Sequence, residues 1–186
     1  MAREVEQFRQ QFEQMSLDAD ALVGPLSDEQ FTWQPKPDAW SVALCIEHLN
    51  TTARLYLPQL DEAIANAIRR GTYGEGPFSY NVFGRFFTAA IEPPARFRLS
   101  TPQPFDPPDV RPRPEVMAAF RAYQVQFVDR LRQANGLDLA RAKVRSPVNS
   151  WLRFSLGSGF ALMLAHERRH LWQARNVVAN PAFPKQ

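Results

Sequence analysis

The sequence predicts an all-α fold, a four-helix bundle with a proline-rich extended segment between the second and third long helices. Two observations carry this prediction: four segments repeat apolar residues at helical spacing, and eight prolines gather within residues 93–114. Glycine accounts for only 8 of the 186 residues, which argues against architectures built from many tight turns. Helices with one apolar face each bury those faces together, and four of them do so as a bundle.

The first part of the chain contains two of the long helices. Over residues 3–22, apolar side chains recur at alternating three- and four-residue steps, which is typical of a bundle seam. These side chains are Val5, Phe8, Phe12, Met15, Ala19 and Leu22. Ser27 and Gln30 form a capping-box pattern that opens a short helical turn. The second long helix is expected from Ser41 to about residue 70, with Pro58 as a kink or bulge inside it.

The second part of the chain contains the proline-rich segment and the other two long helices. Residues 78–92 are rich in aromatic side chains and predict a short helix. Residues 93–114 cannot form a helix; we expect an extended strap pinned by Phe97, Leu99 and Phe105, with a flexible loop as the alternative. Long helices follow over 115–135 and 155–179, joined by an arginine-rich connection over 137–153. Residues 1–186 are expected to form one domain.

Composition excludes several classes of protein. Hydrophobic residues make up 45% of the chain, enough for one globular core. A single cysteine excludes an intramolecular disulfide and any zinc or iron–sulfur site built from cysteines. The N-terminal residues carry charge throughout and do not resemble a signal peptide, and the longest apolar stretch, near residues 156–165, is too short to cross a membrane. We therefore expect a cytoplasmic protein with no membrane partner.

The charge pattern argues against a nucleic-acid partner. The net charge is +3, and the arginines are interleaved with acidic residues instead of forming a basic stripe. Nucleic-acid binding would require arginines gathered on one face and a steeply salt-dependent affinity. Arg141, Arg145 and Arg153 precede the last helix. They either belong to a solvated connection or attract an anionic substrate.

The three histidines are the most informative residues of the sequence. His166 and His170 are four residues apart on the last helix, so both imidazoles face the same side. His48 lies near the start of the second long helix and supplies a third nitrogen if the two helices are neighbours. A catalytic metal ion needs three protein ligands and an open position for water. The alternative is that each histidine is a hydrogen-bonded or surface residue.

Residues 166–170 also match H-E-x-x-H, the signature of zinc peptidases. In that class the third metal ligand lies downstream of the second histidine. Only sixteen residues follow His170, and none of them is His, Asp or Glu. A third ligand must therefore come from upstream, which is a different architecture.

Two motifs resemble the DinB/YfiT-like family. One is the aromatic and proline-containing loop at residues 33–41 (WQPKPDAWS), followed by Glu47-His48-Leu49; the other is HERRHLWQ at residues 166–173. The family combines such a loop, a Trp-Ser helix start, one histidine shortly after it and a His-x-x-x-His in the last helix. The resemblance extends over nearly the whole chain.

The resemblance implies an up–down–down–up four-helix bundle with one divalent metal ion among the helices. The family's ligands correspond to His48, His166 and His170. It implies zinc or nickel as the metal, with iron or manganese as alternatives. It also implies a small-molecule substrate and one of two activities, hydrolysis or transfer of a low-molecular-weight thiol to an electrophile. It does not imply DNA binding. Residues 71–114 depart from the compact family pattern, so the substrate class does not carry over.

Two residues beside the histidines allow two interpretations each. Glu167 is either a catalytic general base that acts on metal-bound water or orients a ligand imidazole, or a surface partner of the neighbouring arginines. Cys45 lies one turn before His48 and is either a soft fourth ligand or a small core residue.

The leading hypothesis is a metal-dependent hydrolase or thiol transferase. The alternative is a metal-stabilised binding or structural protein without turnover. An enzyme keeps an open coordination position beside a pocket, whereas a structural site is closed by a fourth protein ligand, for which Cys45 is the soft candidate. A homodimer formed through an apolar helix face is a further expectation.

Overall fold

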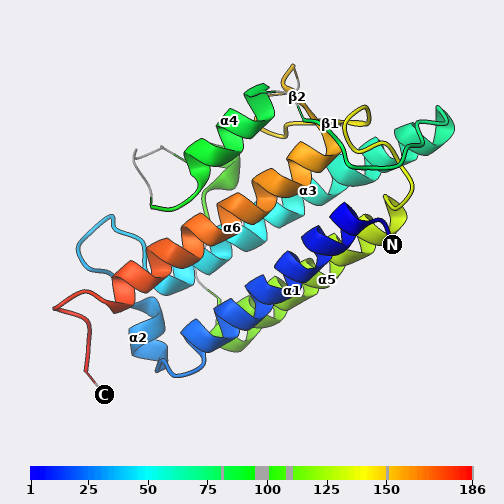
Figure 1. The fold of residues 1–186 in the computed structure, drawn as a ribbon. Coiled ribbons are helices and arrows are strands. Elements are labelled where there is room, and N and C mark those ends of the chain that lie inside the picture. Colours follow the sequence, from blue (N-terminus) through cyan, green and yellow to red (C-terminus); the bar gives the residue numbers. More distant parts are fainter. Residues whose placement is uncertain (81, 95–100, 108–110, 150, 186) are drawn as a thin grey trace.

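Four long helices lie side by side in the computed structural model, which describes residues 1–80, 82–94, 101–107, 111–149 and 151–185 (Figure 1). They are α1 (Arg3–Val23), α3 (Val42–Arg69), α5 (Arg113–Gln133) and α6 (Leu156–Val178). Helices α1 and α3 each pack against both α5 and α6. This arrangement places α5 and α6 at opposite corners of the bundle. The all-α four-helix bundle predicted from the sequence is confirmed.

Serine side chains fix where three of the helices begin. Ser41 accepts a hydrogen bond from the backbone N–H of Leu44 at the start of α3, and Ser155 accepts one from Ser158 at the start of α6. Ser27 and Gln30 form the predicted capping box at α2 (Asp28–Thr32). Helices α3 and α6 carry the histidines. By setting where these two helices begin, the caps also set the height along the bundle at which the three imidazoles lie.

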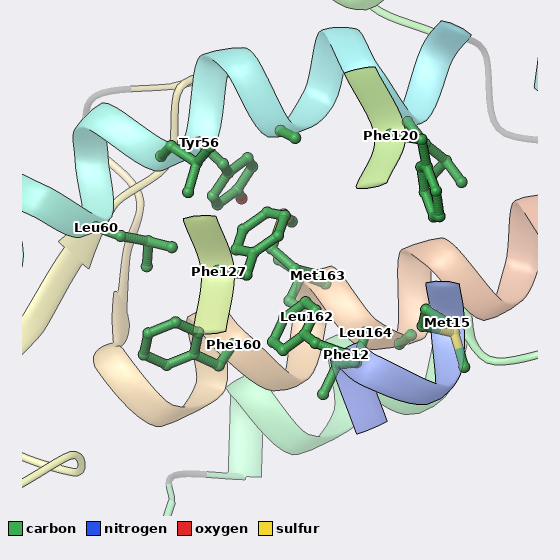
Figure 2. Close-up of a cluster of buried hydrophobic side chains, with 14 of the residues drawn as sticks. Phe12, Met15, Tyr56, Leu60, Phe120, Phe127, Phe160, Leu162, Met163 and Leu164 are labelled. Atoms are coloured by element: carbon green, nitrogen blue, oxygen red, sulfur yellow. The ribbon is translucent and has the colours of Figure 1, made fainter. Parts of the chain in front are cut away.

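The core lies between the four long helices and contains several aromatic rings in contact with one another (Figure 2). Phe12 of α1 stacks on Phe127 of α5 with ring centroids 4.7 Å apart, and Phe160 of α6 meets Phe12 edge to face. All three rings are buried. These ring contacts join the apolar seams of α1, α5 and α6 in one core.

Pro58 lies inside α3, which continues past it as one 28-residue helix.

A small hairpin in the connection before α6 was not predicted. Strands β1 (Lys143–Arg145) and β2 (Arg153–Ser155) pair antiparallel, where the sequence indicated an irregular connection. Val144 and Phe154 point into the core and are buried. A side chain at Gly159 would lie 2.8 Å from Val144, so this glycine lets β1 approach α6 closely. Three-residue strands are too short to produce a recognisable alternation of apolar and polar residues.

The proline-rich segment is partly described. It contains η1, a 3-10 turn over Gln103–Phe105, and Phe105 is buried as predicted. Phe97 and Leu99, the other two predicted anchors, lie outside the described residues. Helix α5 begins at Arg113, two residues earlier than the sequence indicated. Helix α4 (Val82–Ile91) precedes the segment and packs on α6.

In the described part of the chain, none of the helices combines the length and hydropathy that crossing a membrane requires.

Candidate metal centre

The three histidines meet between α3 and α6. One nitrogen from each of His48, His166 and His170 lies within 4.8 Å of the other two. The Nε2 atoms of His48 and His166 are 3.1 Å apart, and the ring centroid of His170 is 4.5 Å from each of the other two rings. The neighbouring helices and the four-residue spacing on α6 therefore bring the imidazoles together as predicted.

A backbone carbonyl orients His48. Its Nδ1–H donates a hydrogen bond of 2.7 Å to the carbonyl oxygen of Phe105, in the proline-rich segment. A neutral imidazole that donates from Nδ1 carries its lone pair on Nε2. The lone pair of His48 is therefore directed towards the cluster, in the arrangement usual for a metal-binding histidine.

Trp40 packs on the histidine cluster. Its ring centroid is 4.9 Å from that of His48 and 5.5 Å from that of His170, on which it stacks at 26°. Trp40 directly precedes the cap residue Ser41, so the start of α3 fixes the indole beside the imidazoles. The contacts of this tryptophan are therefore with the site itself.

Burial keeps the three imidazoles neutral. It lowers the pKa of His48, lowers that of His166 to about 3, and lowers that of His170 well below the usual value. Mutual repulsion between the imidazolium forms acts in the same direction for His166 and His170. Neutral imidazole is the form that binds a metal ion.

The residues fit a divalent cation by two measures. Two nitrogens at 2.0–2.1 Å from one tetrahedral ion are about 3.3 Å apart, close to the 3.1 Å between His48 and His166. Nδ1 of His170 is buried without a hydrogen-bond partner among the described residues. A buried polar atom without a partner is costly, so this nitrogen is available to a ligand that the protein itself does not supply.

The cluster forms part of the wall of a cavity of about 1140 Å³. Much of the rest of the lining is apolar. These lining residues include Trp40, Phe87, Ile91, Phe105, Leu162, Met163 and Trp172. Four charged side chains, Lys36, Asp38, Asp106 and Arg169, also lie on the lining. A large, mainly apolar cavity with a few convergent polar groups is typical of a site for a small molecule.

A family model described as DinB superfamily matches residues 11–174. The chain belongs to the DinB superfamily. The match includes α3 and nearly all of α6 up to Ala174, and hence all three histidines. Comparisons with curated proteins and with solved structures find no match. The family predicted from the two sequence motifs is confirmed, and the three histidines form a group whose nitrogens lie close enough together to hold one metal ion.

Glu167 occupies the core of this DinB bundle. It is buried, and its Oε1 accepts a hydrogen bond of 2.9 Å from Nε2 of Gln124, which lies diagonally across the bundle on α5. Burial raises its pKa to about 8. It is not among the residues that line the cavity. The structure thus joins Glu167 to Gln124, and its catalytic role stays a prediction.

Cys45 lies outside the histidine cluster. It is fully buried, and burial raises the pKa of its thiol to about 12. The group of candidate ligand atoms in the described residues contains the three histidines and not this sulfur. These observations favour the interpretation of Cys45 as a small core residue.

An ion pair beside His48 was missed in the sequence. Glu47 is buried and receives two hydrogen bonds from Arg111, of 2.7 and 2.8 Å, and a third from Asn50. These bonds lower the pKa of Glu47 although burial alone would raise it. The signal present in the sequence was an acidic residue next to a candidate ligand. Its partner was hidden because Arg111 lies 64 residues away, in the proline-rich segment.

Proposed function

We propose that this DinB protein is a divalent-metal-dependent enzyme that acts on a small molecule, as a hydrolase or as a transferase of a low-molecular-weight thiol. The observation that carries the proposal is the convergence of three neutral histidine nitrogens, within 4.8 Å of one another, on the wall of a cavity of about 1140 Å³. His48, His166 and His170 would hold the ion. A bound ion would supply a Lewis acid that lowers the pKa of a water or thiol.

The other residues of the site have positioning roles in this proposal. Phe105 and Trp40 hold His48 from two sides, through its Nδ1 atom and through its ring face. The apolar lining excludes water from the reacting groups, which strengthens every electrostatic interaction inside the cavity. Lys36 and Arg169 are the cations of the lining that attract an anionic substrate, such as a thiolate or a carboxylate.

Two observations favour an enzyme over a structural metal site. Structural zinc sites are closed by four protein ligands, whereas catalytic sites have three and leave one position open. The described candidate group here has three members, and the fourth candidate, Cys45, is a core residue outside it. The group also borders a cavity large enough for a small-molecule substrate. A metal-stabilised binding protein without turnover remains the second candidate, because the same cavity suits a bound ligand.

The experiment that tests the proposal is a ligand titration of the cobalt(II)-loaded protein, followed by visible absorption. We expect added thiol or azide to change the cobalt bands, because the ion keeps an exchangeable position. A strong near-ultraviolet band with thiol alone would favour the transferase. A spectrum that no added ligand changes would contradict the enzyme and favour a closed site. The His166→Ala/His170→Ala double variant is the control and is expected to bind no cobalt.

A further inference from the structure

A second hollow in the surface lies between the hairpin and the C-terminal part of α3. Its volume is about 140 Å³. Five cationic side chains line it: Arg70, Arg141, Lys143, Arg145 and Arg153. One acid, Glu62, lies on the same lining. The hollow therefore has a strongly positive lining, whereas the whole chain of 186 residues has a net charge of only +3.

The register of the hairpin places two of these arginines side by side. Arg145 is directly opposite Arg153 in the β1–β2 pair, so both side chains lie on the same face of the hairpin. Both are exposed, while Val144 and Phe154 occupy the buried face. Like charges directly opposite each other destabilise a strand pair. The pairing is thus unfavourable unless something negative lies over it.

The five cations have no carboxylate partner in the part of the chain that the structure describes. Eight other arginines do form an ion pair with a carboxylate. Those eight are Arg9, Arg111, Arg113, Arg121, Arg130, Arg132, Arg168 and Arg175. The acid nearest in sequence, Asp138, accepts hydrogen bonds of 3.0 Å from the backbone of Ala140 and Arg141 instead.

We propose that this hollow binds the phosphate group of a small phosphorylated molecule. Guanidinium groups bind phosphate oxygens bidentately, and several of them converge where phosphate is recognised. The volume is well below the roughly 300–1,000 Å³ of a site that encloses a whole drug-sized ligand. It therefore matches one compact anionic group, with the rest of the molecule outside. A nucleic-acid backbone would instead require cations along an extended track.

This site is separate from the histidine cluster. Both lie on α3, but Glu62 is fourteen residues beyond His48, which is about 21 Å along a helix. None of the five cations lines the histidine cavity. The proposal therefore stands whether or not the metal centre is catalytic.

Thermal unfolding and calorimetry of the full chain test the proposal, with inorganic phosphate, glycerol 3-phosphate and a single-stranded oligonucleotide as probes. We expect both phosphates to raise the melting temperature more than chloride at the same ionic strength. Stronger binding of glycerol 3-phosphate would identify a phosphate monoester as the ligand, and equal binding would identify free phosphate. The Arg145→Gln/Arg153→Gln variant is expected to lose at least about tenfold in phosphate affinity. Arg121→Gln, outside the hollow, is the matched control and is expected to bind phosphate like the native protein.

A second readout uses the repulsion between the two arginines. Without phosphate and at low salt, Arg153→Gln is expected to raise the melting temperature by about 1–2 °C, because it removes the like-charge pair. A lower melting temperature would mean that Arg153 stabilises the hairpin unaided, and would remove the reason to infer a ligand. Equal phosphate responses of the native protein and the double variant, or oligonucleotide binding without a phosphate response, would overturn the proposal.

Discussion

Nδ1 of His48 lies 2.7 Å from the carbonyl oxygen of Phe105, so a buried residue of the proline-rich segment orients a histidine of α3. The two residues are 57 positions apart in the sequence. The proline-rich segment therefore contributes directly to the candidate metal centre. A second contact joins the same segment to α3, because Arg111 forms an ion pair with Glu47, the residue before His48.

Phe105→Ala tests whether this carbonyl positions His48. Loss of the buried ring loosens the backbone that accepts the hydrogen bond, and such contacts around a ligand histidine are worth about 10–100-fold in metal affinity. We expect a loss of that size in competition with a chromophoric chelator. Phe86→Ala is the matched control, since Phe86 is 71% exposed. Equal metal affinities of the two variants would contradict the positioning role.

Arg111→Gln leaves the buried carboxylate of Glu47 without its charged partner. We expect the free energy of unfolding to fall by about 1–3 kcal/mol, with a discount for the partial exposure of Arg111. Urea unfolding measures the change. Arg121→Gln breaks a surface pair with Asp20 and is expected to cost less than about 1 kcal/mol. Similar losses in the two variants would show that Glu47 does not depend on Arg111.

The raised pKa of Glu167 predicts that the free energy of unfolding depends on pH. Its pKa is raised to about 8 in the folded protein, against an ordinary value of 4.5. Between these pH values the folded state binds a proton that the unfolded state does not, so Glu167 lowers stability as the pH rises from about 4.5 to 8. Glu167→Gln has no such proton. We expect the variant to gain up to a few kcal/mol over the native protein at pH 8, and to lose this advantage near pH 4.5.

Chelator-treated protein is the material for this comparison, because a bound cation would act on the neighbouring carboxyl. The difference between native protein and variant isolates Glu167 from the histidines, which titrate in both. A difference in unfolding free energy that stays constant from pH 4.5 to 8 would show that the buried carboxyl does not titrate in this range.

Cys45→Ala distinguishes a core cysteine from a fourth ligand. The buried thiol, whose pKa is raised to about 12, is expected to resist thiol reagents in the folded protein. The variant is expected to bind the same amount of metal as the native protein and to lose about 1 kcal/mol of stability through the small cavity. A large loss of bound metal would instead identify Cys45 as a ligand and favour a closed structural site.

The long helices could be predicted because their apolar residues repeat over many turns. The histidine cluster could be predicted because two of its members share one helix face. The spacing along α6 also carries a signal for the position of Glu167, because Phe160, Leu164, Glu167 and Leu171 form one continuous seam. Glu167 thus occupies a core position of that seam, which its burial confirms. A charged residue is usually exposed, so the sequence alone also allows a surface position for Glu167.

Contacts between distant segments could not be predicted. The bond from His48 to Phe105 involves a backbone carbonyl, which every residue has, so no residue type marks it. The pairing of Arg145 with Arg153 depends on the register of a hairpin whose strands contain three residues each. From the sequence, Arg141, Arg145 and Arg153 either belong to a solvated connection or attract an anionic substrate. The hollow itself depends on the fold, which places Arg70 beside these three arginines.

Metal content of untagged protein purified without chelator, measured beside the His166→Ala/His170→Ala variant, tests whether the three histidines form a metal centre. A histidine tag must be absent because it binds the same metals. We expect about one equivalent of divalent metal in the native protein and almost none in the variant. A native protein that stays metal-free after incubation with zinc, nickel, manganese and ferrous iron would contradict this expectation.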